Sequence, residues 1–212
     1  MDRHDIPIAY FEAAAIGHPS PLKDEPMTPH SLAFYMGVIT SGTVLGAKPT
    51  DTPDRVTSIL GSDFAENSFD DQSMWRDYGM VEFFWCRESR NHAWTGHHFT
   101  LQVHRLSMGG STVNRVIRER YGRFGRQLRF DKLERLLTTR RVQLEDVPGP
   151  NAPTYTLHWQ PASQVSVMVR RSPERGSRQL DSARIGDVYT VSSSTSAEQV
   201  AWYRSRYGGQ NA

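Results

Sequence analysis

The chain has 212 residues, of which 37% are hydrophobic, 10% aromatic and 23% charged, and its formal net charge is +2. This length suits one globular domain with a substantial core, and the composition excludes disorder over most of the chain. A net charge this close to zero excludes neither a protein nor a nucleic acid as a partner, so the distribution of charge along the chain has to be considered.

Cysteine content and hydropathy bear on the cellular compartment. Cys86 is the single cysteine, so no disulfide can form within the chain. The first residues mix acidic and basic groups, and no apolar segment of the kind found in secretory signals follows them. No run reaches the roughly 18 apolar residues that a membrane helix needs. The sequence therefore predicts a soluble, cytoplasmic protein.

The N-terminal thirty residues differ in composition from the rest of the chain. They contain five prolines, and repeated proline prevents regular backbone pairing. We therefore expect residues 1–30 to form a Pro-rich N-terminal arm with one short helix at 9–16. Residues 31–207 are expected to form a single α+β domain, and the apolar run at 32–40 is predicted to be its first strand.

Residues 52–60 carry clear signals for a short helix. Thr52 is a good N-cap, Pro53 suits the first helical position, and Gly61 follows the last apolar residue. The polar and acidic segment that comes next, residues 62–72, is expected to be a loop.

Two segments, 80–86 and 97–106, alternate in the way that half-buried strands do. The side chains that share the apolar faces are Val81, Phe83 and Trp85 in the first segment and Phe99, Leu101 and Val103 in the second. We expect the two strands to form a hairpin closed by residues 87–96. A hairpin connection of this length is unusual, and such loops often carry binding residues.

The remaining elements are predicted from capping residues and apolar periodicity. Ser111 and Asp131 are N-cap candidates for two central helices, and Ser196 for a C-terminal one. Further strands are expected at 142–147, 154–159, 164–170 and 186–192. Because the strands cluster between helices, the predicted fold class is α+β, with a mainly antiparallel sheet and short helices packed on one side.

Four histidines lie close together in the sequence and raise the question of a metal site: His92, His97, His98 and His104. On one extended strand His98 and His104 would be about 20 Å apart, and His97 and His98 would point to opposite faces. A zinc ion needs its ligand atoms about 2 Å away. The sequence therefore predicts no metal and no cofactor. An enzyme of unfamiliar type that uses histidines on an exposed sheet face stays open as an alternative.

Other catalytic signatures are weak or missing. Cys86 ends the apolar run that begins at Phe83, so we expect a buried or half-buried structural thiol and not a nucleophile. The Gly-x-Ser-x-Gly pattern of serine hydrolases does not occur in the sequence. The chain is therefore predicted to be non-enzymatic and to act by binding another macromolecule.

Residues 51–88 form an acidic segment, with nine acidic residues and three arginines. Part of this segment combines carboxylates with large apolar side chains, and such a combination suits an interface with a basic protein. For Trp75 itself, burial in the core is the preferred interpretation. The residues predicted to bind a protein partner, including one from the hairpin tip 91–95, are Asp63, Glu66, Asp70, Asp71, Trp75, Asp77 and Trp94.

Residues 105–141 form a basic segment, with ten arginines and one lysine against three acidic residues. Arg115, Arg118 and Arg126 fall near one side of the first helix predicted here, so the helices of 111–141 are an alternative nucleic-acid-binding surface. No helix-turn-helix, zinc-finger or RNP motif accompanies them. The preferred interpretation is a solvated helix face whose arginines pair with the acidic segment of the same chain.

One stretch of the chain resembles a known family. The residues that carry the resemblance are Gly46, then Thr52-Pro53-Asp54-Arg55-Val56-Thr57-Ser58-Ile59-Leu60-Gly61, then Met74-Trp75-Arg76-Asp77-Tyr78-Gly79-Met80-Val81-Glu82-Phe83-Phe84. Over residues 46–106 the chain resembles the small bacterial immunity proteins of polymorphic toxin systems, which share a short helix ending in Leu-Gly, an acidic loop and a Tyr-Gly-x-x-Glu-Phe strand. The resemblance implies a non-enzymatic protein that binds a cognate protein toxin and neutralises it by occlusion. It assigns no functional residue, because such families recognise toxins through variable surfaces.

Overall fold

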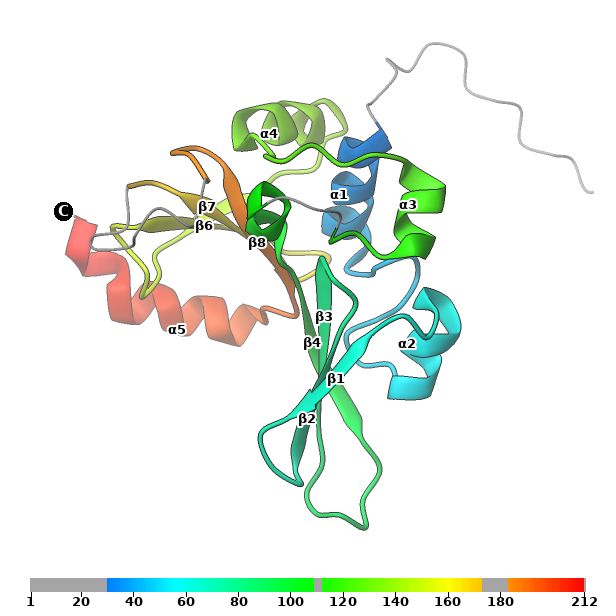
Figure 1. Ribbon diagram of the computed structural model, residues 1–212. Coiled ribbons are helices and arrows are strands. Elements are labelled where there is room, and N and C mark those ends of the chain that lie inside the picture. Colours follow the sequence, from blue (N-terminus) through cyan, green and yellow to red (C-terminus); the bar gives the residue numbers. More distant parts are fainter. Residues whose placement is uncertain (1–29, 109–111, 173–182, 212) are drawn as a thin grey trace, which may run out of the picture.

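The computed structural model describes residues 30–108, 112–172 and 183–211. Eight strands form one antiparallel sheet in the order β1-β2-β3-β4-β8-β7-β6-β5, and five α-helices pack around it (Figure 1). This arrangement confirms the predicted α+β class. The N-terminal arm, with its predicted helix at 9–16, lies outside the described residues.

The elements have the following bounds. The strands are β1 (Ala65–Ser68), β2 (Ser73–Asp77), β3 (Val81–Cys86), β4 (Thr95–Leu101), β5 (Glu145–Val147), β6 (Tyr155–Gln160), β7 (Val165–Arg170) and β8 (Val188–Ser193). The helices are α1 (His30–Ser41), α2 (Pro53–Leu60), α3 (Arg115–Tyr121), α4 (Phe130–Thr139) and α5 (Ala197–Tyr207), with 3-10 turns η1 (Val103–Met108) and η2 (Gly208–Asn211). None of the helices described is long and apolar enough to cross a membrane.

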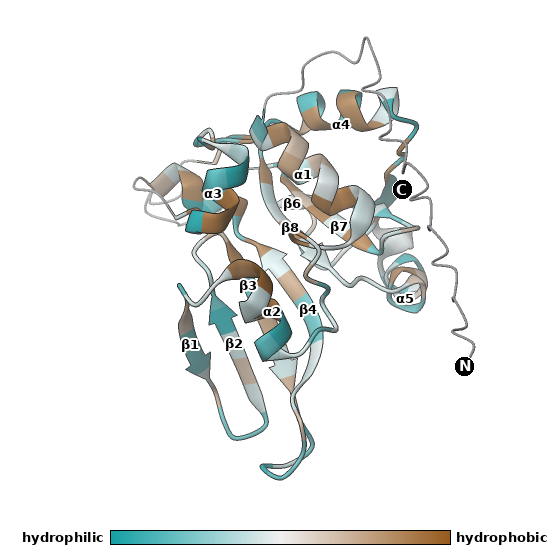
Figure 2. Ribbon diagram, turned by 90° about the vertical axis from the view of Figure 1, so that its right-hand side faces the viewer, coloured by the Kyte–Doolittle hydropathy of each residue, from teal (hydrophilic) through white to brown (hydrophobic). Residues whose placement is uncertain are grey.

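The main core lies between one face of the sheet and helices α1 to α4. Figure 2 looks toward this side, with α2 in front of β3 and β4. Residues Val81, Phe83 and Trp85 of β3 point into this core and are at most 1% exposed. The alternation predicted for 80–86 is therefore confirmed.

Helix α1 replaces the strand predicted at 32–40, and that prediction was wrong. Five of its side chains are buried: Phe34, Tyr35, Met36, Val38 and Ile39. They form a broad buried face, because α1 packs against β7, α3 and α4 at once, and within residues 32–40 only Gly37 and Thr40 are exposed. A short apolar run without a polar face does not distinguish a buried strand from a buried helix.

Helix α2 forms as its capping residues predict. The Thr52 hydroxyl accepts a hydrogen bond from the Arg55 N–H at 3.3 Å. At the other end Gly61 takes a positive φ of 82° and donates its N–H to the Thr57 carbonyl. Helix α5 is capped in the same way by Ser196, also as predicted.

The central helices begin differently from the prediction. Helix α3 is capped by Asn114, whose side-chain oxygen accepts from the Val116 N–H at 3.0 Å, and the predicted cap Ser111 lies outside the described residues. The predicted cap of α4, Asp131, lies instead in the first turn of that helix. A carboxylate there still interacts favourably with the helix dipole.

The β3–β4 hairpin is confirmed, but two neighbouring predictions need correction. Strand β4 ends at Leu101, and the second half of the predicted strand 97–106 forms η1. The predicted loop 62–72 contains β1, which pairs along the outer edge of β2. All four residues of β1 are exposed, so it carries no apolar alternation by which a strand is recognised.

Candidate functional site

The second face of the sheet is covered unevenly. Helix α5 lies on it at the β5–β6 end, where Val147, Trp159 and Val200 form a small second core. No α-helix of the described ranges lies against the half of this face that belongs to β1–β4, since α2 lies on the opposite side (Figure 1). The 3-10 turn η1 borders this half at the inner end of β2 and β3, where Arg105 reaches Asp77 and Glu82. The uncovered half is the part of the sheet that is open to a partner.

Four rings lie in a row across this uncovered half: Phe69, Trp75, Phe84 and His98. The ring centroids of Phe69 and Trp75 are 4.5 Å apart, those of Trp75 and Phe84 6.4 Å, and those of Phe84 and His98 4.1 Å. The last two pairs are stacked, with interplanar angles of 19° and 14°. We call these residues the aromatic row.

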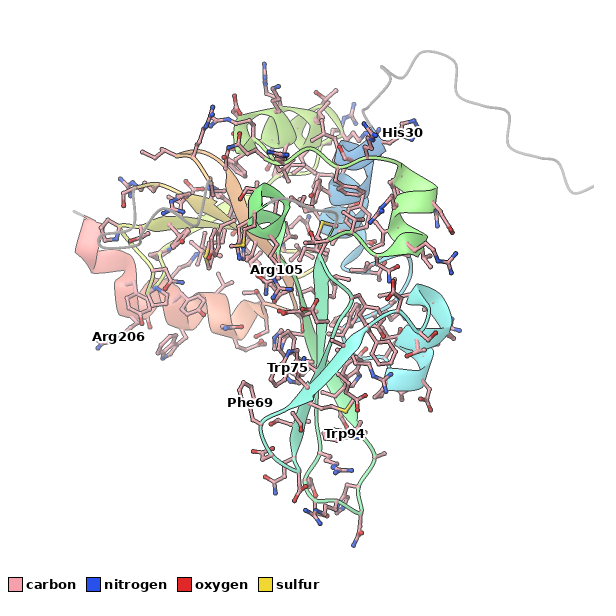
Figure 3. All side chains as sticks on the ribbon, in the orientation of Figure 1. His30, Phe69, Trp75, Trp94, Arg105 and Arg206 are labelled. Atoms are coloured by element: carbon pink, nitrogen blue, oxygen red, sulfur yellow. The ribbon has the colours of Figure 1, made fainter. Side chains whose placement is uncertain are left out.

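Strand register creates the aromatic row. Trp75 of β2 and His98 of β4 both stand opposite Phe84 of β3, and residues that are opposite in an antiparallel sheet share a face. Phe69 follows β1 and packs beside Trp75 (Figure 3). The alternation along β3 places Phe84 on the face opposite Phe83 and Trp85.

The aromatic row leaves a large apolar area in contact with solvent. Phe69 is 82% exposed, and Trp75, Phe84 and His98 are half-buried. The preferred prediction that Trp75 belongs to the core was wrong, because its strand register points it away from α2. A contiguous exposed patch of large rings on a soluble domain is typical of an interaction site.

The predicted acidic residues mostly have partners within the fold. Glu66 forms an ion pair with Arg76 at 2.8 Å, and Asp71 forms one with Arg90. Asp70 accepts hydrogen bonds from the Ser73 hydroxyl and from two backbone N–H groups. These bonds lower the pKa of its carboxyl group, and the bond from the hydroxyl has the largest effect. Asp63 is exposed beyond the end of α2.

Asp77 belongs to a buried charge network. The Arg105 guanidinium donates to Asp77 at 2.8 Å and also pairs with Glu82, which is 6% exposed (Figure 3). Gln102 donates a further hydrogen bond to Glu82. Asp77 and Glu82 face the same side as the aromatic row, so this network borders the row at the inner end of β2 and β3.

Trp94 lies apart from the aromatic row. Its ring packs against the main core and lies 4.1 Å beneath the Arg87 guanidinium. The structure therefore brings together Trp75 with Phe69, Phe84 and His98, and leaves Trp94 on its own in the hairpin. The sequence analysis did not select Phe69, Phe84 or His98 as binding residues. The sequence contains one signal for the exposure of Phe69. Its neighbours are polar or acidic, so no large apolar residues at helix or strand spacing place its ring in a core.

The histidines do not lie where an unbroken strand would put them. Strand β4 has a bulge opposite Phe84 and Trp85. This bulge brings the Nδ1 atoms of His97 and His98 to 2.7 Å from each other. The prediction that these two side chains point to opposite faces of the sheet was therefore wrong. His104 belongs to η1 and stacks on Tyr189. Within the described ranges, no group of three His, Cys, Asp or Glu side chains is arranged to hold a metal ion.

Cys86 also differs from its prediction. Its side chain is exposed at the end of β3, although the three residues before it are apolar. Strand alternation explains the difference, since Cys86 follows the buried Trp85 and therefore points to the uncovered face.

Burial of the histidine pair predicts a pH dependence of stability. Burial lowers the pKa of both histidines. The pKa of His98 falls to about 4, with burial as the larger cause and the charge of His97 as the smaller one. The folded state therefore favours neutral rings, while the unfolded chain takes up protons near pH 6.5. We expect the free energy of unfolding to fall as the pH decreases from about 6.5 to about 4, by about 1–2 kcal/mol for a half-exposed, solvent-screened ring. Urea unfolding at several pH values checks this. The same slope in the His98→Gln variant as in the parent would contradict the assignment.

The predicted basic residues lie on the side of the main core helices, away from the aromatic row. Arg115 pairs with Glu119 of its own helix at 2.8 Å, and Arg118 donates to the Val113 carbonyl at 2.7 Å. In the described part of the chain, none of Arg115, Arg118 and Arg126 forms an ion pair with the acidic segment. The expected pairing of the two segments instead involves Arg105.

Comparison of the chain with protein-family models, with curated proteins and with solved structures finds no match.

Proposed function

We propose that this protein is a non-enzymatic immunity protein that binds a cognate protein toxin and neutralises it by occlusion, with the aromatic row at the centre of its binding surface. The observation that carries the proposal is the row of neighbouring rings on the uncovered half of the sheet, in which Phe69 is 82% exposed and the other three are half-buried. The resemblance of residues 46–106 to immunity proteins supports the choice of partner.

The chemistry of the row favours a protein partner with a specific surface. Phe69 stands out from the turn after β1 and can enter an apolar pocket, and burying such a ring contributes roughly 1.5–3 kcal/mol. The exposed carboxylates of Asp70 and Asp71 follow it on the same turn. Charge complementarity therefore predicts a toxin surface with an apolar cleft ringed by lysine and arginine.

The exchange of Phe69 and Trp75 for alanine tests this proposal. We expect the double variant to bind the toxin domain at least roughly 30-fold more weakly, because buried aromatic anchors dominate interface energies. A candidate toxin domain is to be sought beside the gene for this chain, and binding is measured by calorimetry with purified proteins, together with growth of cells that express both.

A matched control separates binding from general surface effects. Ile185 is also a large exposed apolar residue, at 56%, but it lies in the turn before β8. The Ile185→Ala variant should bind and protect like the parent. Failure of the parent chain to protect cells would overturn the immunity function, and full protection by the Phe69→Ala, Trp75→Ala variant would overturn the assigned surface.

A further inference from the structure

A cavity of about 480 Å³ lies at the C-terminal end of α3, on the side of the main core helices. Three guanidinium groups reach it, from Arg118 in α3 and from Arg123 and Arg126 in the segment that follows. Its volume is within the range of small-molecule sites, about 300–1,000 Å³. No acidic residue contributes to the wall that the described residues form. We call this cavity the arginine pocket.

The three arginines of the pocket differ from Arg115 and Arg129, which precede and follow them in the basic segment. Arg115 pairs with Glu119, and Arg129 pairs with Asp131 and Asp187. Within the ranges that the structure describes, no carboxylate forms an ion pair with Arg118, Arg123 or Arg126. Positive charges that share one cavity repel each other, so an anion with several charges would stabilise this arrangement.

Part of the pocket wall is held in place by contacts within the fold. The Arg118 guanidinium is held by its hydrogen bond to the Val113 carbonyl, which leaves its other N–H groups for a ligand. Phe124 forms part of the wall, and its ring makes edge contacts with Phe34 and Tyr35 at centroid distances of 5.4 and 5.8 Å. A wall fixed in this way needs little reordering on binding, which favours affinity.

We propose that the arginine pocket binds the polyphosphate group of a small ligand, such as inorganic pyrophosphate or a nucleoside di- or triphosphate. Guanidinium groups donate two parallel hydrogen bonds to phosphate oxygens and stay charged at all physiological pH values. Pyrophosphate supplies enough oxygens to engage all three arginines at once. The pocket and the aromatic row share no residue, so this inference stands independently of the proposed function.

Calorimetry of the full chain with pyrophosphate and with ATP, at low and at moderate salt, tests the inference. We expect pyrophosphate to bind the parent chain. The Arg123→Gln, Arg126→Gln variant should bind roughly 30-fold or more weakly, since it loses the charge-assisted contacts of two guanidinium groups. ATP binding in addition would identify a nucleotide as the ligand, and binding of pyrophosphate alone would identify the inorganic ion.

The Arg115→Gln variant is the matched control. It removes one positive charge from α3, near the pocket, but Arg115 is paired with Glu119 and does not line the pocket, so it should bind within about 2-fold of the parent. An equal loss in this variant would show a general charge effect and overturn the site. No binding of pyrophosphate or ATP by the folded parent would also overturn it. So would binding of a single-stranded RNA 12-mer that depends on Arg123 and Arg126 but is not displaced by pyrophosphate. Both glutamine variants should still bind the toxin domain, which separates this test from that of the aromatic row.

Discussion

Replacement of Gly79 by alanine is expected to lower the free energy of unfolding by at least about 2 kcal/mol. Gly79 has a φ of +91°, a conformation that costs an L-residue about 1 kcal/mol or more. A β-carbon at this position would lie 1.9 Å from the Thr112 carbonyl oxygen. Because that neighbour is backbone, the chain has to shift, and strain of this kind adds about 1–3 kcal/mol. Urea or guanidinium unfolding followed by tryptophan fluorescence measures the loss.

Gly37 provides the control for this substitution. It lies exposed on α1, and a β-carbon there would meet no atom within 4 Å. Alanine is the better helix former, so Gly37→Ala should leave stability unchanged or raise it by up to about 1 kcal/mol. A Gly79→Ala protein that loses less than about 1 kcal/mol would show that the strand can move away from Thr112, contrary to our expectation.

Replacement of Arg105 by methionine is expected to destabilise the protein by about 3 kcal/mol. The methionine side chain keeps much of the apolar stem but leaves Glu82, which is 6% exposed, without its ion-pair partner. Removing one partner of a buried ion pair costs about 3–5 kcal/mol, and we expect the lower end because the Arg105 side chain is 29% exposed. Thermal and denaturant unfolding both report this change.

Two further variants test the origin of the Arg105 effect. Arg115→Met removes an arginine from the exposed pair with Glu119 and should cost less than about 1 kcal/mol. Glu82→Gln in the Arg105→Met background removes the uncompensated charge, so the double variant should be more stable than the sum of the single changes predicts. Additive losses would mean that Arg105 acts through packing alone.

Gly79 belongs to the Tyr-Gly-x-x-Glu-Phe motif, and Arg105 pairs with Glu82 of the same motif. The residues of this motif therefore have structural roles. Tyr78 is buried beside Thr57 of α2, Gly79 takes the positive φ, and Glu82 anchors Arg105. Phe83 fills the core. Every named position of the motif therefore has a structural reason, and the motif specifies how β3 meets α2 and η1.

The fold was predicted well where local signals were sufficient. Helix α2 follows from Thr52 and Gly61, because capping is decided by hydrogen bonds within a few residues. Strand β3 follows from its alternation. Helix α1 was not predictable in this way, since Gly37 and Thr40, the exposed residues within 32–40, do not form the charged face that marks a helix. Strand β1 was missed because pairing with β2, and not its own apolar pattern, makes it a strand.

The candidate site depends almost entirely on tertiary structure. The sequence by itself determined the α+β class, the cap-defined helices, the β3–β4 hairpin and the separation of acidic from basic residues, because periodicity, capping and charge are local properties. Only the tertiary structure decided that Phe69, Trp75, Phe84 and His98 form one row and that most acidic candidates are paired within the fold. Strand register and a one-residue bulge set these contacts, and a shift of one residue moves a side chain to the opposite face of the sheet.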